Sequence, residues 1–260
     1  MGKVIAVANQ KGGVGKTTTS VNLAVSLGYY GKKVLLIDYD PQASSTVSLG
    51  INRKKNYNTI ENVILGKIDI RKAIIELHDF SINIIPTTIE SSDLPRQIRM
   101  MKLDQDYILR SKIEKIKDTF DYILIDCPPS FSFHTLSALY GSDSVIIPVQ
   151  CQFLAIDGLT QLLNTIRLIQ KNLKTNQYDL KIEGILLTML DKRSKASWQI
   201  VNELKKYFEE GIFQTIIPSN VAAQNAPNYG IPIMKYQKRS TSAKHYLLLA
   251  KEIIKNNEEQ

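Results

Sequence analysis

The residues best suited to chemistry lie near the N-terminus, in the run Lys11-Gly12-Gly13-Val14-Gly15-Lys16-Thr17-Thr18. Glycines let successive backbone N–H groups turn toward phosphate oxygens, and a helix that begins here adds partial positive charge. In such a loop Lys16 would hold the β- and γ-phosphates of a nucleotide, and Thr17 would place its hydroxyl on Mg²⁺. Gln10 departs from the strict pattern, which has glycine there. The three glycines and the Lys-Thr pair outweigh this departure, and the run predicts a nucleotide site.

Lys11 is an unusual residue in this loop, because a phosphate-binding loop has no required lysine at that position. A second lysine beside the phosphates could reach a nucleotide held by a second subunit. From the loop alone, a surface lysine with no such role is the favoured explanation of this residue.

Three aspartates follow apolar runs elsewhere in the chain. Asp38 and Asp40 come after 34–37, and their spacing puts both on one side of an extended segment. A carboxylate beyond the end of a parallel strand can orient an attacking water or order a Mg²⁺ shell. Because Asp40-Pro41 is also a common turn opener, spacing alone leaves a turn or helix cap open. Asp126 ends the run 122–125, a pattern that delivers an acid to the outer shell of a bound metal.

These groups must be positioned by elements that the apolar pattern predicts. Unbroken β-branched runs are typical of parallel strands covered on both faces, and they occupy 4–8, 34–37, 82–85, 122–125, 144–149 and 182–187. Helices are predicted over 17–30, ending before Gly31, and over 155–172, 197–208 and 240–255. Alternation of the two predicts an α/β fold with a doubly wound, mostly parallel sheet flanked by helices.

No boundary rich in Pro, Gly or Ser divides the chain, so we expect one domain over residues 1–260. We expect a surface loop over 50–58 and a frayed tail over 256–260. The apolar start at Met1 is too short for a signal peptide and runs directly into the glycine loop.

The composition narrows the class of protein. No apolar run reaches the roughly 20 residues of a membrane span, and two cysteines cannot form a disulfide scaffold. Both features favour a reduced, cytoplasmic protein. The net charge of +8 favours a polyanionic partner such as nucleic acid or an anionic membrane, although a lysine-rich solvated surface would give the same charge.

Three segments together resemble the ParA/Soj family of DNA-partition ATPases, within the deviant Walker A (MinD/ParA) group. They are the glycine loop 11–18, Ile37-Asp38-Tyr39-Asp40-Pro41-Gln42 and Ile125-Asp126-Cys127-Pro128-Pro129-Ser130. The resemblance continues through 187–189 and 216–218 to 230–233, and so covers nearly the whole chain.

The resemblance implies ATP and Mg²⁺ as cofactors and gives roles to individual residues. Lys11 matches the signature lysine that contacts ATP across a nucleotide-sandwich dimer, and Asp40 matches the residue that positions water. Asp38 supports the metal region with Thr17 and Asp126. Pro218 and Asn220 match positions near the adenine.

The resemblance also implies that ATP drives homodimerisation and binding to duplex DNA without sequence preference, and that a ParB-like centromere-binding protein stimulates hydrolysis. The chain departs from the family at Ser219 and Ala222, where related proteins carry arginines that are candidates for DNA contact. The remaining basic candidates are Lys192, Arg193, Lys205, Lys235, Lys238, Arg239 and Lys244. Association with the nucleoid in the ATP-bound form is the corresponding expectation.

Three alternatives stay open at this point. A MinD-like ATPase would cycle on membranes, but the polar, acidic C-terminal end lacks the basic amphipathic helix this requires. A related ATPase could position a protein cargo. A redox carrier would hold an iron–sulfur cluster, yet Cys127 and Cys151 offer no ligand spacing. Because the glycine loop begins at residue 11, we expect no helix-turn-helix before it and no operator binding.

Overall fold

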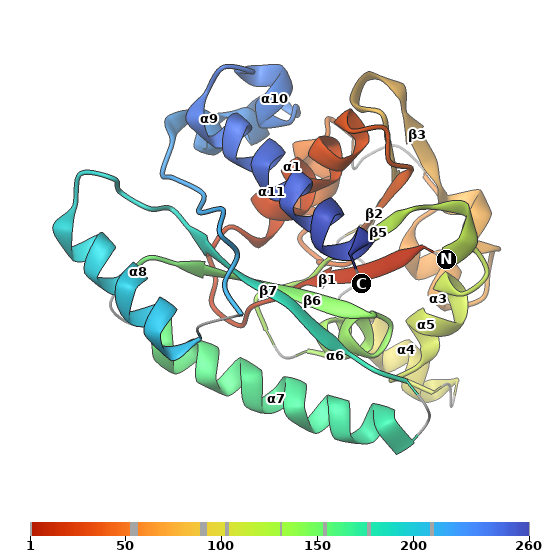
Figure 1. The fold of residues 1–260 in the computed structure, drawn as a ribbon. Coiled ribbons are helices and arrows are strands. Elements are labelled where there is room, and N and C mark those ends of the chain that lie inside the picture. Colours follow the sequence, from red (N-terminus) through yellow and green to blue (C-terminus); the bar gives the residue numbers. More distant parts are fainter. Residues whose placement is uncertain are drawn as a thin grey trace.

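A twisted sheet of seven strands runs through the centre of the molecule (Figure 1). The computed structural model describes residues 2–52, 57–88, 93–101, 104–130, 132–152, 155–175, 178–208 and 211–259. The strand order is β3-β4-β2-β5-β1-β6-β7, and every pairing is parallel except that of β3 with β4. The strands are β1 Lys3–Val7, β2 Val34–Asp38, β3 Ile75–Leu77, β4 Ile82–Ile85, β5 Tyr122–Asp126, β6 Ser144–Gln150 and β7 Lys181–Thr188.

Helices cover both faces of this sheet. The helices that bear most on the site and its surroundings are α1 Lys16–Tyr29, α2 Ser44–Ser48, α9 Val221–Asn225, α10 Ile233–Tyr236 and α11 Thr241–Glu258. The other α-helices are α3 Ile60–Ile64, α4 Leu94–Met100, α5 Ile108–Ile113, α6 Phe133–Tyr140, α7 Ala155–Thr175 and α8 Lys195–Tyr207. Short 3₁₀ turns lie at Ile70–Ala73, His78–Phe80, Lys117–Thr119 and Ala226–Tyr229.

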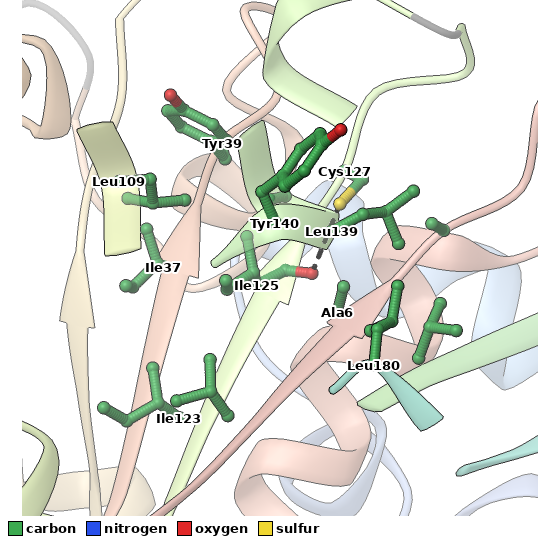
Figure 2. Packing of buried hydrophobic residues seen from close by; sticks show 14 of the residues in the cluster. Ala6, Ile37, Tyr39, Leu109, Ile123, Ile125, Cys127, Leu139, Tyr140 and Leu180 are labelled. Atoms are coloured by element: carbon green, nitrogen blue, oxygen red, sulfur yellow. Dashed lines mark hydrogen bonds between the residues drawn. The ribbon is translucent and has the colours of Figure 1, made fainter. Parts of the chain in front are cut away.

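Alternate residues of each strand enter two separate cores. Ile5 and Val7 of β1 pack with α1 and α11 on one face, whereas Val4 and Ala6 pack with the helices of the other face. Figure 2 shows part of the second core, where Ile37, Ile125 and Leu139 meet. Because successive side chains of a strand point to opposite faces, an unbroken apolar run is what a strand covered on both sides requires.

Cys127 lies in this second core and is fully buried (Figure 2). Its Sγ donates to the carbonyl oxygen of Ile125 at 3.8 Å. Burial raises the pKa of the Cys127 thiol, and burial also raises that of Cys151 to about 11. Burial of both cysteines and the hydrogen bond of Cys127 to a backbone carbonyl favour a packing role for these side chains.

The expected α/β class with a mostly parallel sheet is confirmed. The six expected strands and four expected helices are present, with ends shifted by up to three residues. Strand β3 was not expected, because three residues are too few to show a hydrophobic period. The helix expected over 155–172 runs to Thr175. Gly31 ends α1 as expected, with a positive φ of 79°.

The expectation of a frayed tail over 256–260 is wrong for residues 256–258, because α11 continues to Glu258. Asn257 Nδ2 donates to Glu183 of β7 at 2.9 Å, and Lys32 pairs with Glu258. These contacts tie the last helical turn to β7 and to the segment between α1 and β2. Of the expected loop 50–58, residues 53–56 lie outside the described residues, and Ile51 is buried. Within the described residues no helix is long and apolar enough to cross a membrane.

Candidate nucleotide-binding site

The candidate site lies where three central strands end at the same edge of the sheet. The register pairs Val7 of β1 with Asp126 of β5, and Asp126 with Asp38 of β2. Pairing of β1 and β2 with β5, which is more than 80 residues away from either along the chain, therefore brings the glycine loop and two carboxylates to the same edge. This edge, at the carboxyl ends of parallel strands, is where ligands bind in open α/β sheets.

The glycine loop is open on one side and fixed on the other. Gly12 and Gly13 are exposed, and a Cβ added to either would meet no atom within 4 Å. Gly13 and Gly15 have φ values of 75° and 89°, which favour glycine. Thr188 Oγ1 of β7 donates to the carbonyl of Val14 at 2.9 Å, which anchors the loop to the sheet.

Asn9 supports the loop from below and was missed by the sequence analysis. Its Nδ2 donates to the carbonyl of Pro148 in β6 at 2.6 Å, and its Oδ1 accepts from the backbone N–H of Lys11 at 3.0 Å. Asn9 thus links the loop to a second strand. Its position directly after an apolar run is the one sequence signal that could have indicated it.

Lys16 is buried, and its Nζ donates to the carbonyl oxygen of Lys11 at 3.0 Å. Burial lowers the pKa of Lys16, while the nearby carboxylate of Asp126 opposes that shift. The side chain is held over the loop rather than extended into solvent. An anion on the loop would therefore meet this ammonium without a large movement of the chain.

Asp126 is fully buried and is bound by hydroxyl groups from two helices. Ser20 of α1 donates to Oδ1 at 2.9 Å, and Ser45 of α2 donates to Oδ2 at 2.7 Å. Burial raises the pKa of Asp126, and hydrogen bonds from Ser45, Thr17 and Ser20 oppose the rise. Thr17 and Asp126 therefore lie close together, and their shared role at a metal stays a prediction.

Asp38 is bound in the same manner by the neighbouring residue of α2. Its Oδ2 accepts from the backbone N–H and the hydroxyl of Thr46 at 2.7 Å and 2.6 Å. Burial raises the pKa of Asp38 well above its usual range, and the charge of Asp126 adds to this effect. Neither hydroxyl partner in α2 was expected from the sequence: Ser45 lies 81 residues from Asp126, and no sequence pattern marks Thr46, eight residues after Asp38, as its partner.

Asp40 lies in the turn that leads from β2 to α2. Its backbone N–H donates to Asp38 Oδ1 at 3.3 Å, and its own Oδ1 accepts from the backbone N–H of Gln42 at 2.9 Å. The turn role left open by the sequence is therefore present. The carboxylate of Asp40 is also close enough to Lys16 to oppose, in part, the lowering of the Lys16 pKa by burial. A role in positioning water stays a prediction, and it is compatible with the turn because the second oxygen can accept another bond.

The oxygen donors of this edge fit Mg²⁺ better than a metal held by protein alone. Among the described residues no group of three or more His, Cys, Asp or Glu side chains could hold a metal ion. Mg²⁺ usually keeps several waters and takes one or two carboxylates together with substrate phosphates. The hydroxyl of Thr17 and the carboxylates of Asp38 and Asp126 supply a donor set of this kind.

Pro218 and Asn220, expected near the adenine, lie beyond the end of β7. Leu190 accepts from the backbone N–H of Ser219 at 3.0 Å, which holds this segment beside the strand that anchors the glycine loop. Asn220 caps α9, since its Oδ1 accepts from the backbone N–H of Ala222 at 2.8 Å. Contact with the adenine stays a prediction.

The seven candidate DNA-contacting residues are all exposed, but they lie on several elements. Lys192 and Arg193 line one hollow of about 400 Å³ with Pro218, Ser219 and Asn220. They are thus next to Ser219, where the family pattern has arginine. Lys205 lies on α8, Lys235 on α10, Lys238 and Arg239 between α10 and α11, and Lys244 on α11.

The parallel sheet, the glycine loop before α1 and the aspartates at the ends of β2 and β5 define a P-loop nucleotide-binding protein. The AAA domain family matches residues 2–182. The sporulation initiation inhibitor protein Soj of Bacillus subtilis is 46% identical over 98% of this chain and 100% of its own length. The chromosome partitioning protein ParA of Myxococcus xanthus is 38% identical over 99% of this chain and 89% of its own length.

Among solved structures, cobyrinic acid a,c-diamide synthase of Mycobacterium smegmatis with bound ATP analog and magnesium is 32% identical. It superimposes with a TM-score of 0.83 over 96% of this chain and 93% of its own. The chain belongs to the Soj/ParA family of P-loop ATPases.

Proposed function

We propose that this protein is a DNA-partition ATPase in which Mg²⁺ and ATP assemble two copies into a nucleotide-sandwich dimer. The dimer binds duplex DNA without base preference, and hydrolysis of ATP releases it. A centromere-binding protein of the ParB kind stimulates hydrolysis. The protein works in the cytoplasm and associates with the nucleoid while ATP is bound.

The observation that carries this proposal is the different placement of two lysines in one loop. Lys16 is buried and lies over the loop from inside, whereas Lys11 is half-exposed at its open side. One ammonium therefore serves the nucleotide of its own subunit, and the other is free to face a second copy. The match of both lysines to the family motif supports this division of roles.

The chain's own residues supply the steps around the nucleotide. Backbone N–H groups of the loop and Lys16 bind the phosphates. The side-chain oxygens of Thr17, Asp38 and Asp126 would hold Mg²⁺ and its waters. Mg²⁺, when bound, neutralises charge that develops on the phosphates. Asp40 orients the attacking water, and Ser20, Ser45 and Thr46 fix the carboxylates in place.

DNA binding follows from charge and from pairing. A single basic patch meets few phosphates, but two patches in a dimer double the contacts and add avidity. Contacts to phosphates carry no sequence information, so binding should not depend on the bases. Lys192 and Arg193, beside Ser219, substitute for the family arginines in this proposal.

The test combines sizing with DNA binding. The protein is measured by light scattering with ADP and with a non-hydrolysable ATP analogue, and then by interferometry on two unrelated duplexes. With the analogue we expect a dimer that binds both duplexes equally. With ADP we expect neither the dimer nor this binding. Equal binding with ADP, or strong preference for one duplex, contradicts the proposal. Co-sedimentation with anionic liposomes under the same conditions would instead favour membrane cycling.

A further inference from the structure

A groove between α8 and α11 shares only Lys192 with the candidate DNA-contacting residues named above. It has a volume of about 760 Å³. Its apolar lining includes Trp198 of α8, Leu248 of α11, and Ile212 and Ile216 of the segment that leads from α8 to α9. In Figure 1 this segment passes between the two helices. A recess of this size accommodates a few large side chains of a partner.

The apolar side chains of the groove are unusually exposed. Trp198 is 41% exposed and Leu248 is 53% exposed, although the opposite face of α11 is buried against α1. Single exposed apolar residues are common on protein surfaces, but here they border a recess. Covering them would remove apolar area from water and favour association.

Trp198 is also held in place before any partner arrives. Its indole N–H donates to the carbonyl oxygen of Lys192 at 3.1 Å. A fixed aromatic side chain loses little conformational entropy on binding, which is why Trp is frequent among the residues that dominate interfaces.

The charges around the groove are predominantly positive. Exposed lysines border it at Lys192, Lys251 and Lys255, of which Lys255 pairs with the exposed Glu259 at 3.8 Å. The acidic residue among them, Glu252, accepts from the backbone N–H groups of Gln214 and Thr215 at 2.6 Å and 3.0 Å. Its carboxylate is therefore already engaged in hydrogen bonds to the chain itself. His245 adds no charge near neutral pH, because burial, assisted by the charge of Lys192, lowers its pKa.

We infer that this groove docks an acidic, amphipathic helical segment of a partner protein. Large apolar side chains of that segment enter the recess beside Trp198 and Leu248, and its carboxylates face the lysines of the rim. Duplex DNA offers negative charge but no apolar side chains to fill the recess. A bilayer surface is broad and cannot enter a recess, so it fits this shape less well. A helix that lies in a groove can present apolar side chains to the recess and carboxylates to the rim at the same time.

The chain provides its own reporter, since Trp198 is its sole tryptophan. The probe is a short helical peptide with glutamates on one face and leucine and phenylalanine on the other. Companion peptides replace the glutamates by lysine or the apolar residues by serine. We expect the first peptide alone to shift the fluorescence of Trp198, in the full chain without nucleotide.

Two variants test the assignment, and two matched variants control for it. Leu248→Ser and Lys251→Glu should each weaken peptide binding about tenfold, as expected for residues that dominate an interface. Leu168→Ser on α7, at a site 65% exposed, and Lys206→Glu on α8 change the same side-chain types outside the groove and should have no effect. Because the two groove residues are exposed, thermal unfolding should confirm that all four variants fold.

Each other outcome overturns the inference. No change with any peptide, or equal binding of the acidic and basic peptides, removes the acidic segment as the occupant. If duplex DNA shifts the fluorescence, and if Lys251→Glu but not Leu248→Ser abolishes that shift, the groove belongs to a DNA-binding face. If anionic vesicles shift the fluorescence of Trp198, and if Leu248→Ser but not Lys251→Glu abolishes that shift, the groove contacts membrane. Since no arm requires ATP hydrolysis or dimerisation, failure here leaves the proposed partition function untouched.

Discussion

The Nζ atom of Lys16 lies 3.0 Å from the carbonyl oxygen of Lys11, so the two lysines of the glycine loop are joined through one hydrogen bond. The ammonium of the inner lysine is thereby held across the loop by the backbone of the outer one. A phosphate oxygen carries more negative charge than a carbonyl and is a stronger acceptor. Nucleotide binding can therefore transfer the ammonium from Lys11 to the phosphates.

We expect Lys16→Ala to weaken ATP binding on the order of 100-fold, because each hydrogen bond to a charged group contributes about 1.5–3 kcal/mol. Calorimetric titration with ATP and Mg²⁺ measures the change. Lys67→Ala, at an exposed site after α3, is the matched control and should bind normally. Unchanged affinity in Lys16→Ala would remove this residue from the site.

We expect Asp40→Ala to bind ATP but to hydrolyse it about 100-fold more slowly or worse, because the attacking water is no longer oriented and misplacement of a reacting group by about 1 Å can cost on the order of 100-fold. The variant should accumulate as the ATP-bound dimer, which sizing in ATP detects. Asp40→Asn is the sharper variant, because its amide oxygen can still accept from the backbone N–H of Gln42. If Asp40→Asn hydrolyses ATP at the normal rate, Asp40 serves only the turn.

We expect Lys11→Ala and Lys11→Gln to lose ATP-dependent dimerisation or hydrolysis while retaining nucleotide binding, since Lys16 remains in place. The backbone carbonyl that accepts from Lys16 is unaffected by either change. Light scattering with the non-hydrolysable analogue and phosphate release with ATP measure the two activities. If both survive, Lys11 is a surface residue of the loop.

We expect Thr46→Val to destabilise the fold by about 1–3 kcal/mol, because a buried carboxylate loses a hydroxyl donor. Asp38 would keep the backbone N–H of residue 46 as a donor, so the loss should be partial. Urea unfolding gives the free energy. Thr165→Val, whose hydroxyl donates to a helix carbonyl on the exposed side of α7, is the control and should change stability less. Equal effects of the two changes would show that the bond to Asp38 has no special weight.

We expect replacement of Lys235, Lys238 and Arg239 together by Ala to weaken DNA binding alike on all sequences. Each phosphate contact contributes about 0.9 to the slope of log affinity against log salt, so the slope should fall by roughly 2–3 for each subunit of the dimer that contacts the DNA. Interferometry over a salt series on two duplexes measures both quantities. An unchanged slope would place the DNA-binding surface elsewhere, for example around Lys192 and Arg193.

The sequence by itself determined the features that are local in the chain. The glycine loop 11–18, the strand before it and the helix after it are covalently continuous, so a local pattern of residues was enough to predict them. The apolar runs 34–37 and 122–125 predicted strands buried on both faces, and β2 and β5 are such strands. The acids that follow were therefore correctly expected at strand ends.

Only the tertiary structure decided which distant groups meet. Asp126 is bonded to Ser20 and Ser45, which lie 106 and 81 residues away, and no local pattern marks either serine. These contacts exist because parallel strands joined by crossovers bring β2, β5 and β1 side by side. The groove beside Trp198 has the same origin, since α8 and α11 come together only when both pack around the sheet. Strand order depends on the packing of the whole chain, and that packing has no signature in any single segment.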